Sequence, residues 1–343
     1  MSVSRAAYGL AAGVVVMALA ALAGCHEVTE YTDSGEFGAV ILDASDLSVE
    51  GYVAGMEGAR TLASMGGSSF LVGTSTGMVY EVNSDQQVIT ASHRVSAGSS
   101  AALDCFTKSP VGSSMYMRAG SGKLLEVSTE GFDVLDDFSA GPYPSAICRS
   151  PEALGRIYVT DAEEGTLREV NASTNEVNWI YDIEPSPAAI AVHCTDPPIM
   201  VIAHGDDEGL HAVRLDWSAP RSNWLFEEGT FADVASAPSD TVLCLAEPCW
   251  DGESGRLWLA RVGWVRPFQK RSYGVTGHPT CVCANSDFSL PYFYAACADG
   301  DRTVVVMVNY LTWKVEATAE IEGYPWDIST HNNGSRLLVL TSL

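Results

Sequence analysis

Positive charge is scarce in this chain. Its 343 residues include only 19 Lys and Arg against 43 Asp and Glu, which gives a formal net charge of −24 at pH 7. A surface of this sign repels phosphates, whereas a nucleic-acid-binding protein needs a basic stripe. The nearest approach to one is Arg266, Lys270 and Arg271, in a single predicted loop. We therefore expect no nucleic-acid partner and no direct binding to anionic lipid headgroups.

Sequence motifs of the common catalytic and cofactor sites are also missing. The chain has no GxSxG, HExxH, P-loop, GxGxxG or CxxC motif, so serine hydrolases, zinc proteases, nucleotide-binding enzymes and zinc or haem sites lose their usual support. The histidines after the first 24 residues are scattered without metal-ligand spacing. His193 and His331 lie near the ends of predicted inner strands, where a structural role is the simpler interpretation. We predict no catalytic residue and expect no cofactor.

The start of the chain indicates export and a lipid anchor. Arg5 is the only charge in the first 24 residues, and the apolar run over residues 10–22 is too short to span a bilayer, as in a secretory signal. Residues 22–25, Leu-Ala-Gly-Cys, resemble the lipobox of bacterial lipoproteins. That resemblance implies cleavage before Cys25 and its acylation, and two or more acyl chains anchor a protein stably. The alternative is an ordinary cleavage site with a coincidental cysteine.

The same resemblance suggests a location and a domain organisation. His26, rather than an aspartate, follows Cys25, which resembles the default for sorting to the outer membrane in a cell with two membranes. We expect a signal peptide at 1–24, a flexible tether at 25–37 and a single domain at 38–343. Eight cysteines remain after Cys25, an even number that suits disulfides in an oxidising compartment. Cys281 and Cys283 would share one face of a strand, so each is expected to pair elsewhere or to stay a small buried hydrophobe.

An internal repeat predicts the fold. About every forty residues the chain presents an apolar segment, a Gly, Pro, Ser or Asp break, a near-continuous apolar strand, often a glycine turn, and further strands, of which the fourth often carries an aromatic residue such as Trp179 or Trp313. This spacing is typical of one four-stranded propeller blade. The seven repeats open at Leu62, Ala102, Ala146, Ala189, Val234, Cys281 and Asp327.

The two ends of the repeat array complement each other. The seventh unit stops at Leu343, directly after its second strand, while residues 38–42 and 47–53 form a pair of strands without an inner half. Pairing these two halves would complete a blade and remove the exposed edges of an open array. The sequence therefore predicts an all-β fold, a seven-bladed β-propeller closed by pairing the N-terminal strands with the C-terminal half-blade.

The third unit carries a family resemblance. Its Tyr158-Val159-Thr160-Asp161, the Gly-Thr-Leu at 165–167 and the closing Trp179 resemble a YVTN-type or PQQ-like propeller repeat, with Asn175 where those families have glycine. The match is partial in the first unit and faint in the others. A quinoprotein dehydrogenase of this kind would also carry adjacent cysteines, which this chain lacks. The resemblance implies the architecture and no particular activity, because propellers host many functions.

Acidic residues gather in the turns between the second and third strands of units three to six. Equivalent turns of a propeller lie on one face, and the connections from the fourth strand to the next blade share it and add Asp182, Glu184, Glu227, Glu228 and Asp233. Such a face would bind a basic partner, a cationic ligand or Ca²⁺; the alternative is that Asp and Gly simply make turns. The predicted binding face comprises Asp161, Glu163, Glu164, Asp206, Asp207, Glu208, Trp250, Asp251, Asp299 and Asp301.

These observations favour a binding or assembly module over an enzyme. We expect a lipid-anchored propeller of the cell envelope whose partner is an envelope protein or a basic or cationic ligand, and which contacts the membrane through its lipid only. The alternative hypothesis is an extracytoplasmic enzyme of the lactonase or lyase type, with carboxylates and a divalent metal at the central channel.

Overall fold

The structure is a computed structural model in which the regular elements of the described residues are all β-strands. None of the described residues belongs to a helix long and apolar enough to cross a bilayer. The predicted signal peptide, Cys25 and most of the predicted tether lie outside the described residues. Those residues are 36–95, 106–109, 112–119, 122–150, 155–193, 199–205, 209–214, 221–226, 229–238, 241–249, 254–262, 267–287, 289–331 and 333–343.

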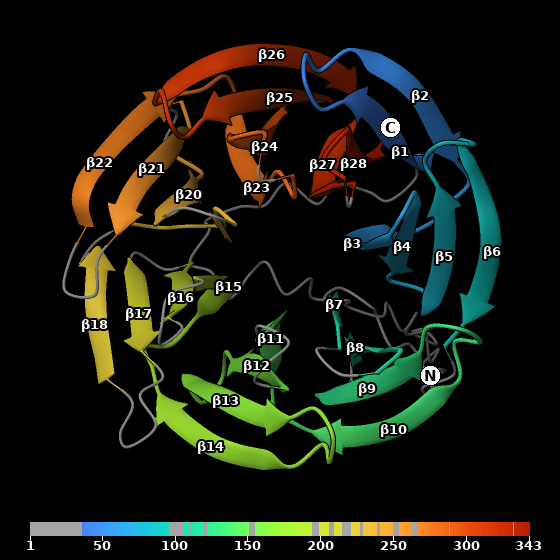
Figure 1. Ribbon diagram of the computed structural model, residues 1–343, viewed down its shortest axis with the longest axis vertical. Helices are drawn as coiled ribbons and strands as arrows, with labels where there is room; N and C mark the ends of the chain where they lie inside the picture. Colours follow the sequence, from blue (N-terminus) through green and yellow to red (C-terminus); the bar gives the residue numbers. More distant parts are fainter. Residues whose placement is uncertain are drawn as a thin grey trace, which may run out of the picture.

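The described strands form seven four-stranded antiparallel sheets arranged in a ring (Figure 1). In blades 1 to 6 the four strands follow one another in sequence from the axis outward. Blades 1 to 3 comprise β3 (Ala59–Gly66), β4 (Ser69–Thr74), β5 (Met78–Asn83) and β6 (Val88–Arg94); β7 (Phe106–Lys108), β8 (Ser114–Ala119), β9 (Lys123–Ser128) and β10 (Val134–Ser139); and β11 (Pro144–Arg149), β12 (Arg156–Asp161), β13 (Thr166–Asn171) and β14 (Val177–Asp182).

The next three blades continue the ring with the same strand order. Each near-continuous apolar segment that the repeat predicts lies in the second strand of its blade, so the repeat assignment is confirmed. The opening of the second unit, Ala102, falls outside the described residues. Blades 4 to 6 comprise β15 (Pro187–His193), β16 (Ile199–His204), β17 (Leu210–Arg214) and β18 (Arg221–Phe226); β19 (Asp233–Ser236), β20 (Val242–Glu247), β21 (Arg256–Val262) and β22 (Pro267–Gly274); and β23 (His278–Ala284), β24 (Tyr292–Asp299), β25 (Arg302–Asn309) and β26 (Lys314–Glu322).

The seventh blade joins both ends of the chain. Its strands are β27 (Tyr324–Thr330), β28 (Arg336–Ser342), β1 (Phe37–Asp43) and β2 (Val49–Ala54), in the order β2-β1-β28-β27. Val40 pairs with Val339 of β28 on one side and with Tyr52 of β2 on the other. The predicted seven-bladed ring, closed by the N-terminal strands, is therefore confirmed.

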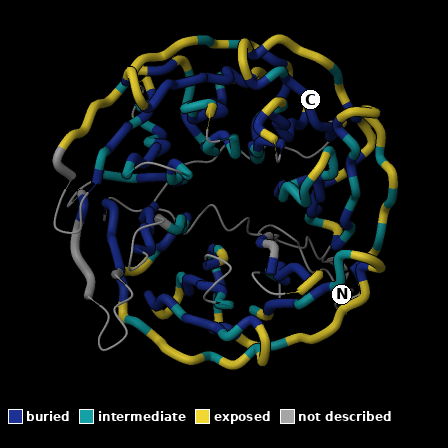
Figure 2. Tube along the Cα trace, in the orientation of Figure 1, coloured by how far each residue is buried: buried dark blue, intermediate teal, exposed yellow. Residues whose placement is uncertain are grey.

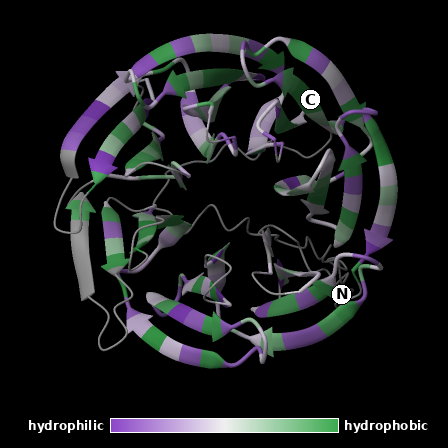
Figure 3. Ribbon diagram, viewed as in Figure 1, coloured by the Kyte–Doolittle hydropathy of each residue, from purple (hydrophilic) through white to green (hydrophobic). Residues whose placement is uncertain are grey.

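The second strand of each blade is the centre of the core. All six residues of β16 are buried, and six of the seven in β28 are. A strand covered by a neighbouring blade on each face needs no polar alternation, which explains the continuous apolar runs. The outermost strands carry most of the exposed residues (Figure 2), and the hydrophobic residues concentrate in the strands that lie inside this outer ring (Figure 3).

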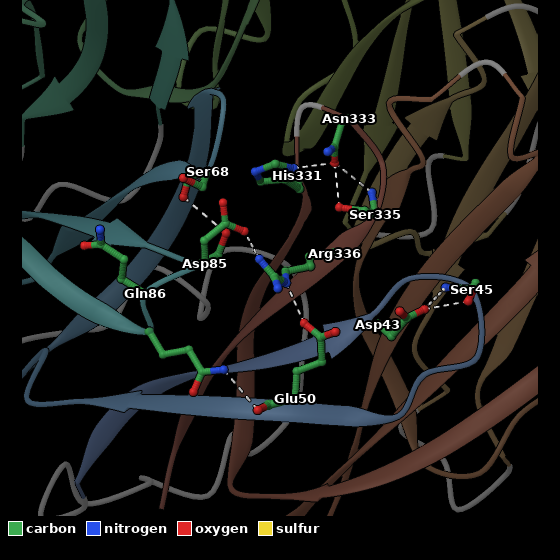
Figure 4. Close-up of polar contacts among 12 residues, drawn as sticks. Asp43, Ser45, Glu50, Ser68, Asp85, Gln86, His331, Asn333, Ser335 and Arg336 are labelled. Carbon is green, nitrogen blue, oxygen red and sulfur yellow. Dashed lines mark hydrogen bonds and ion pairs between the residues drawn. The ribbon is translucent and has the colours of Figure 1, made fainter.

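Arg336 joins the closing blade to blade 1 (Figure 4). Its Nε donates to Glu50 Oε2 of β2 at 2.5 Å, and its Nη1 donates to Asp85 in the turn between β5 and β6. Gln87 of that same turn donates from Nε2 to the Glu50 carbonyl at 3.1 Å. These contacts link the N-terminal strand pair, the C-terminal strand and the first blade at one place.

Most of the predicted glycine turns have the expected backbone. Gly77, Gly122, Gly165 and Gly209 have φ between 60° and 81°, the left-handed region that a tight hairpin requires. Gly255 does not share this conformation. A Cβ there would lie 2.2 Å from Pro279 Cδ, so its glycine is explained by the close approach of the next blade.

The repeat pattern placed Trp313 in the fourth strand of its blade, and the structure shows that this was wrong. Trp313 occupies the turn before β26 with φ 57° and is only 7% exposed. Its carbonyl accepts hydrogen bonds from Arg271 Nη1 at 3.1 Å and Tyr273 Oη at 2.6 Å, both on β22 of blade 5. Trp313 therefore joins blades 5 and 6.

Candidate functional site

The predicted acidic face is most developed on blade 3. The turn between β12 and β13 lies beside the segment that follows β14, because Ile183 N–H donates to the Gly165 carbonyl at 2.8 Å. Glu163, Glu164, Asp182 and Glu184 are all exposed there. We call these four residues the blade 3 corner.

Asp161 belongs to the interior of this turn. It is fully buried, and its Oδ2 accepts a hydrogen bond from Tyr143 N–H at 2.7 Å. Its Oδ1 accepts from the N–H groups of Glu163 at 3.1 Å and Glu164 at 2.9 Å. Asp161 therefore holds the turn and the neighbouring connection between β10 and β11, and its buried carboxylate does not form part of an exposed face.

Cations neutralise part of the predicted face. On blade 3 Arg168 forms an ion pair with Glu164. On blade 6 Arg302 lies 3.6 Å from Asp299 Oδ2 and 2.8 Å from Glu320 Oε2. Among the described residues no ion pair is formed by Glu163, Asp182 and Glu184 on blade 3 or by Asp301 on blade 6, and all four are exposed. Asp206, Asp207, Glu208, Trp250 and Asp251, with Glu227 and Glu228, lie outside the described residues.

The other end of β14 is fixed to blade 2 by Asn175. Its Nδ2 donates to Glu126 Oε2 at 2.8 Å and to Asp136 Oδ2 at 2.9 Å, and Tyr116 Oη donates to its Oδ1 at 2.9 Å. Asn175 has φ 56°, a conformation that glycine adopts freely and asparagine tolerates better than most residues. This backbone explains why asparagine stands where the resembling repeat has glycine.

Two aspartates link first strands of neighbouring blades near the axis. Asp233 of β19 accepts from Val234 N–H at 2.7 Å and from Val282 N–H of β23 at 2.8 Å. Both carboxylate oxygens of Asp233 therefore accept backbone hydrogen bonds, Oδ1 within blade 5 and Oδ2 from blade 6.

Asp327 of β27 repeats the arrangement between blades 7 and 1. Its Oδ1 accepts from Ile328 N–H at 2.7 Å, and its Oδ2 accepts from Leu62 N–H of β3 at 2.6 Å and from Thr61 Oγ1 at 3.1 Å. The sequence signal for both aspartates is a lone carboxylate before a β-branched residue in an otherwise uncharged first strand.

Burial raises the pKa values of the two aspartates near the axis, Asp233 and Asp327. Burial, together with a smaller contribution from the Asp327 charge, raises the pKa of Asp233 to about 7, and burial raises that of Asp327 to about 6. Cys281 and Cys283 lie on β23 between them, and burial together with both carboxylates raises their thiol pKa values. Protonated thiols are poor nucleophiles and poor metal ligands.

The buried cysteines behave as small hydrophobes. Cys244, Cys281, Cys283 and Cys297 are free thiols, and burial raises the pKa of Cys297 to about 12. Cys281 packs in the core between blades 6 and 7, and Cys283 packs against that core from the same face of β23, as predicted. Cys244 and Cys297 pack between blades 5 and 6. Of the two outcomes expected for Cys281 and Cys283, the structure shows the unpaired one.

The surroundings of His331 support the structural role expected for it. It is 5% exposed, and its ring centroid lies 6.1 Å from that of Phe70 in blade 1. Asn333 Oδ1 accepts from Ser335 N–H, so it also accepts from His331 Nδ1 (Figure 4). The side chain of His193 is outside the described set. Within the described residues, no three His, Cys, Asp or Glu side chains are grouped as metal ligands would be.

Comparison with known proteins bears on the fold alone. No family model matches the chain, and no curated protein matches it. Among solved structures, the RRP9 WD40 repeats superimpose with a TM-score of 0.68 at 10% identity, covering 89% of this chain and 98% of that one. The chain has a WD40-like propeller fold. U3-55K gives 0.67 at 10% identity over 88% and 98%, and Kuenenia stuttgartiensis hydrazine synthase gives 0.66 at 13% over 83% and 95%.

Proposed function

We propose that this propeller is a binding module that recruits a basic partner through the blade 3 corner. The observation that carries the proposal is the local excess of exposed carboxylate: Glu163, Asp182 and Glu184 make no ion pair among the described residues. Propellers commonly act as protein-interaction scaffolds, and the closed ring holds this corner on a rigid frame. A corner of one sign on a chain of net charge −24 attracts Lys- and Arg-rich segments and speeds their encounter.

Charge neutralisation at the corner should abolish most of this binding. We expect the triple variant Glu163→Gln, Asp182→Asn, Glu184→Gln to bind a fluorescent oligolysine at least about tenfold more weakly at low salt, measured by anisotropy. Wild-type binding should weaken as salt rises, because mobile ions screen exposed charges beyond about 10 Å at 0.1 M.

A variant with the same net charge serves as the control. Asp301→Asn, Glu316→Gln, Glu322→Gln removes three exposed carboxylates from blade 6 and should change the affinity by less than about twofold. Equal losses in both variants would mean that only net charge matters. Salt-independent binding by the wild type would refute recruitment by charge.

We further propose that the module acts outside the cytoplasm, held to a membrane by acylated Cys25 and to the outer membrane where the cell has two. The support is the residue order of the signal and lipobox-like segment. Cys25→Ala should move the protein from the membrane fraction to the soluble fraction, while Cys244→Ala, a buried thiol in blade 5, should leave it in the membrane. Retention of the Cys25→Ala variant in washed membranes would show that the anchor lies elsewhere.

A further inference from the structure

The outer edge of blade 3 exposes two large apolar side chains in succession. β14 pairs with β13 on one side only. Trp179 is 58% exposed and Ile180 is 55% exposed, and Leu135 on the neighbouring outer strand β10 is 58% exposed. The contact from Asn175 to Asp136 ties these two outer strands together. Two consecutive large apolar side chains on a strand edge differ from the scattered exposed residues of an ordinary surface.

Several other edges of the ring carry charges that discourage strand pairing, although β6 has none before Arg94, its last residue. β10 has Asp136 and Asp137, β22 has Lys270 and Arg271, and β26 carries Lys314 and three glutamates. Charged side chains on an edge strand are a common protection against unwanted pairing. β14 carries no charge before Asp182, its last residue. It is therefore a weakly protected edge.

The backbone of this edge is regular over a short stretch. A bulge falls between Val177 and Trp179, after which Trp179 to Asp182 pair one to one with Glu169 to Thr166 of β13. In an antiparallel sheet, alternate residues of an edge strand turn their N–H and C=O groups away from the partner strand. Residues 179–182 can therefore accept one further short strand.

Carboxylates flank the edge at both ends. Glu176 precedes β14, and Asp182 and Glu184 stand at its end; all three are exposed. The nearest cations on blade 3 are already engaged, because Arg168 pairs with Glu164 and Arg156 pairs with Glu169. A complementary ligand thus has apolar residues in the middle and positive charge at both ends.

We propose that β14 receives an extended segment of a partner protein by strand addition, with apolar side chains against Trp179 and Ile180 and Lys or Arg at both ends. Main-chain hydrogen bonds supply affinity in this mode and side-chain contacts supply specificity. The inference rests on the proposed function and specifies its partner. A second copy is disfavoured as the occupant, because its own Glu176 and Asp182 would meet those of the first.

The test uses the full-length protein and a peptide, Lys-Lys-Val-Thr-Val-Thr-Val-Lys-Lys. Trp179→Ser with Ile180→Ser should weaken its binding about tenfold or more, because a central aromatic contact typically dominates such an interface. The matched control, Leu311→Ser with Val315→Ser, removes exposed apolar residues from blade 6 and should change affinity less than about twofold. Replacing the central valine of the peptide by proline should weaken binding as the first variant does.

The outcomes separate the two proposals. If the Trp179 and Ile180 variant or the proline peptide binds as tightly as its parent, strand addition at β14 is wrong, while salt-dependent oligolysine binding would still support the proposed function. If the wild type binds neither cationic probe, both proposals fail. If the wild type is a dimer by light scattering and the variant is a monomer, the occupant is a second copy and this inference is overturned.

Discussion

Val40→Pro should destabilise the ring by more than about 3 kcal/mol. Val40 lies in the middle of β1, which pairs with β28 on one side and β2 on the other. Proline removes a ladder hydrogen bond there and cannot be accommodated in a central strand. The same blade joins both chain ends, so its failure opens the ring. Urea unfolding followed by tryptophan fluorescence measures the loss.

Val49→Pro in the same blade is the matched control. Val49 is the first residue of the edge strand β2 and is 60% exposed. Proline is tolerated at the first position of an edge strand, so we expect a loss below about 1 kcal/mol. Equal stability of the two variants would show that β1 does not hold the ring closed.

The stability of the wild type that depends on Asp233 and Asp327 should fall as pH rises from about 4 to about 7. In the unfolded chain Asp233 and Asp327 lose their protons near their ordinary value of 3.8, whereas burial raises their folded pKa values to about 7 and about 6. Between these limits the folded state holds more protons, so stability is fully present below the unfolded pKa and is lost as pH rises through the folded values. Each tenfold difference in proton affinity is worth about 1.4 kcal/mol. The total change is several kcal/mol.

Amide variants identify the groups responsible. Asp233→Asn with Asp327→Asn should flatten the slope of stability against pH across this window, whatever it costs in absolute stability, because neither site then titrates. Asp301→Asn, an exposed carboxylate on blade 6, should leave the slope as it is in the wild type. A double variant with the wild-type slope would show that the pH dependence arises elsewhere in the acidic surface.

The repeat predicted the fold well because blade packing imposes a pattern on neighbouring residues. Strands buried on both faces, such as Met200 to Ile202, read as apolar runs, and glycines such as Gly77 and Gly165 mark hairpins that need a positive φ. Ring closure was also predictable, since the two half-blades at the ends have complementary missing strands. Apolar runs and hairpin glycines are visible in short stretches of sequence, and ring closure follows from counting the strands in each repeat.

Side-chain destinations were less predictable, because they depend on the neighbouring blade. Trp179 and Trp313 were both assigned to fourth strands, yet Trp179 lies in β14 and is 58% exposed, whereas Trp313 lies in the turn before β26 and is 7% exposed. Contact with Arg271 and Tyr273 of blade 5 accounts for the burial of Trp313. Asp161 and Asp233 looked like surface acids, but each carboxylate accepts backbone N–H groups from a neighbouring element. The candidate site on blade 3 therefore emerged only once exposure and ion pairing were known.

Hydrogen exchange of the full-length protein with the basic strand peptide tests the central claim most directly. Binding should slow exchange of the outward-facing amides in residues 179–182, because a docked strand accepts hydrogen bonds from them. It should also slow exchange in the turn containing Glu163, because the basic end of the docked strand covers that turn. The other outer strands, such as β26, should exchange as in the free protein. Protection confined to another blade, or none at β14 when the peptide is saturating, would contradict the assignment of blade 3 as the binding edge.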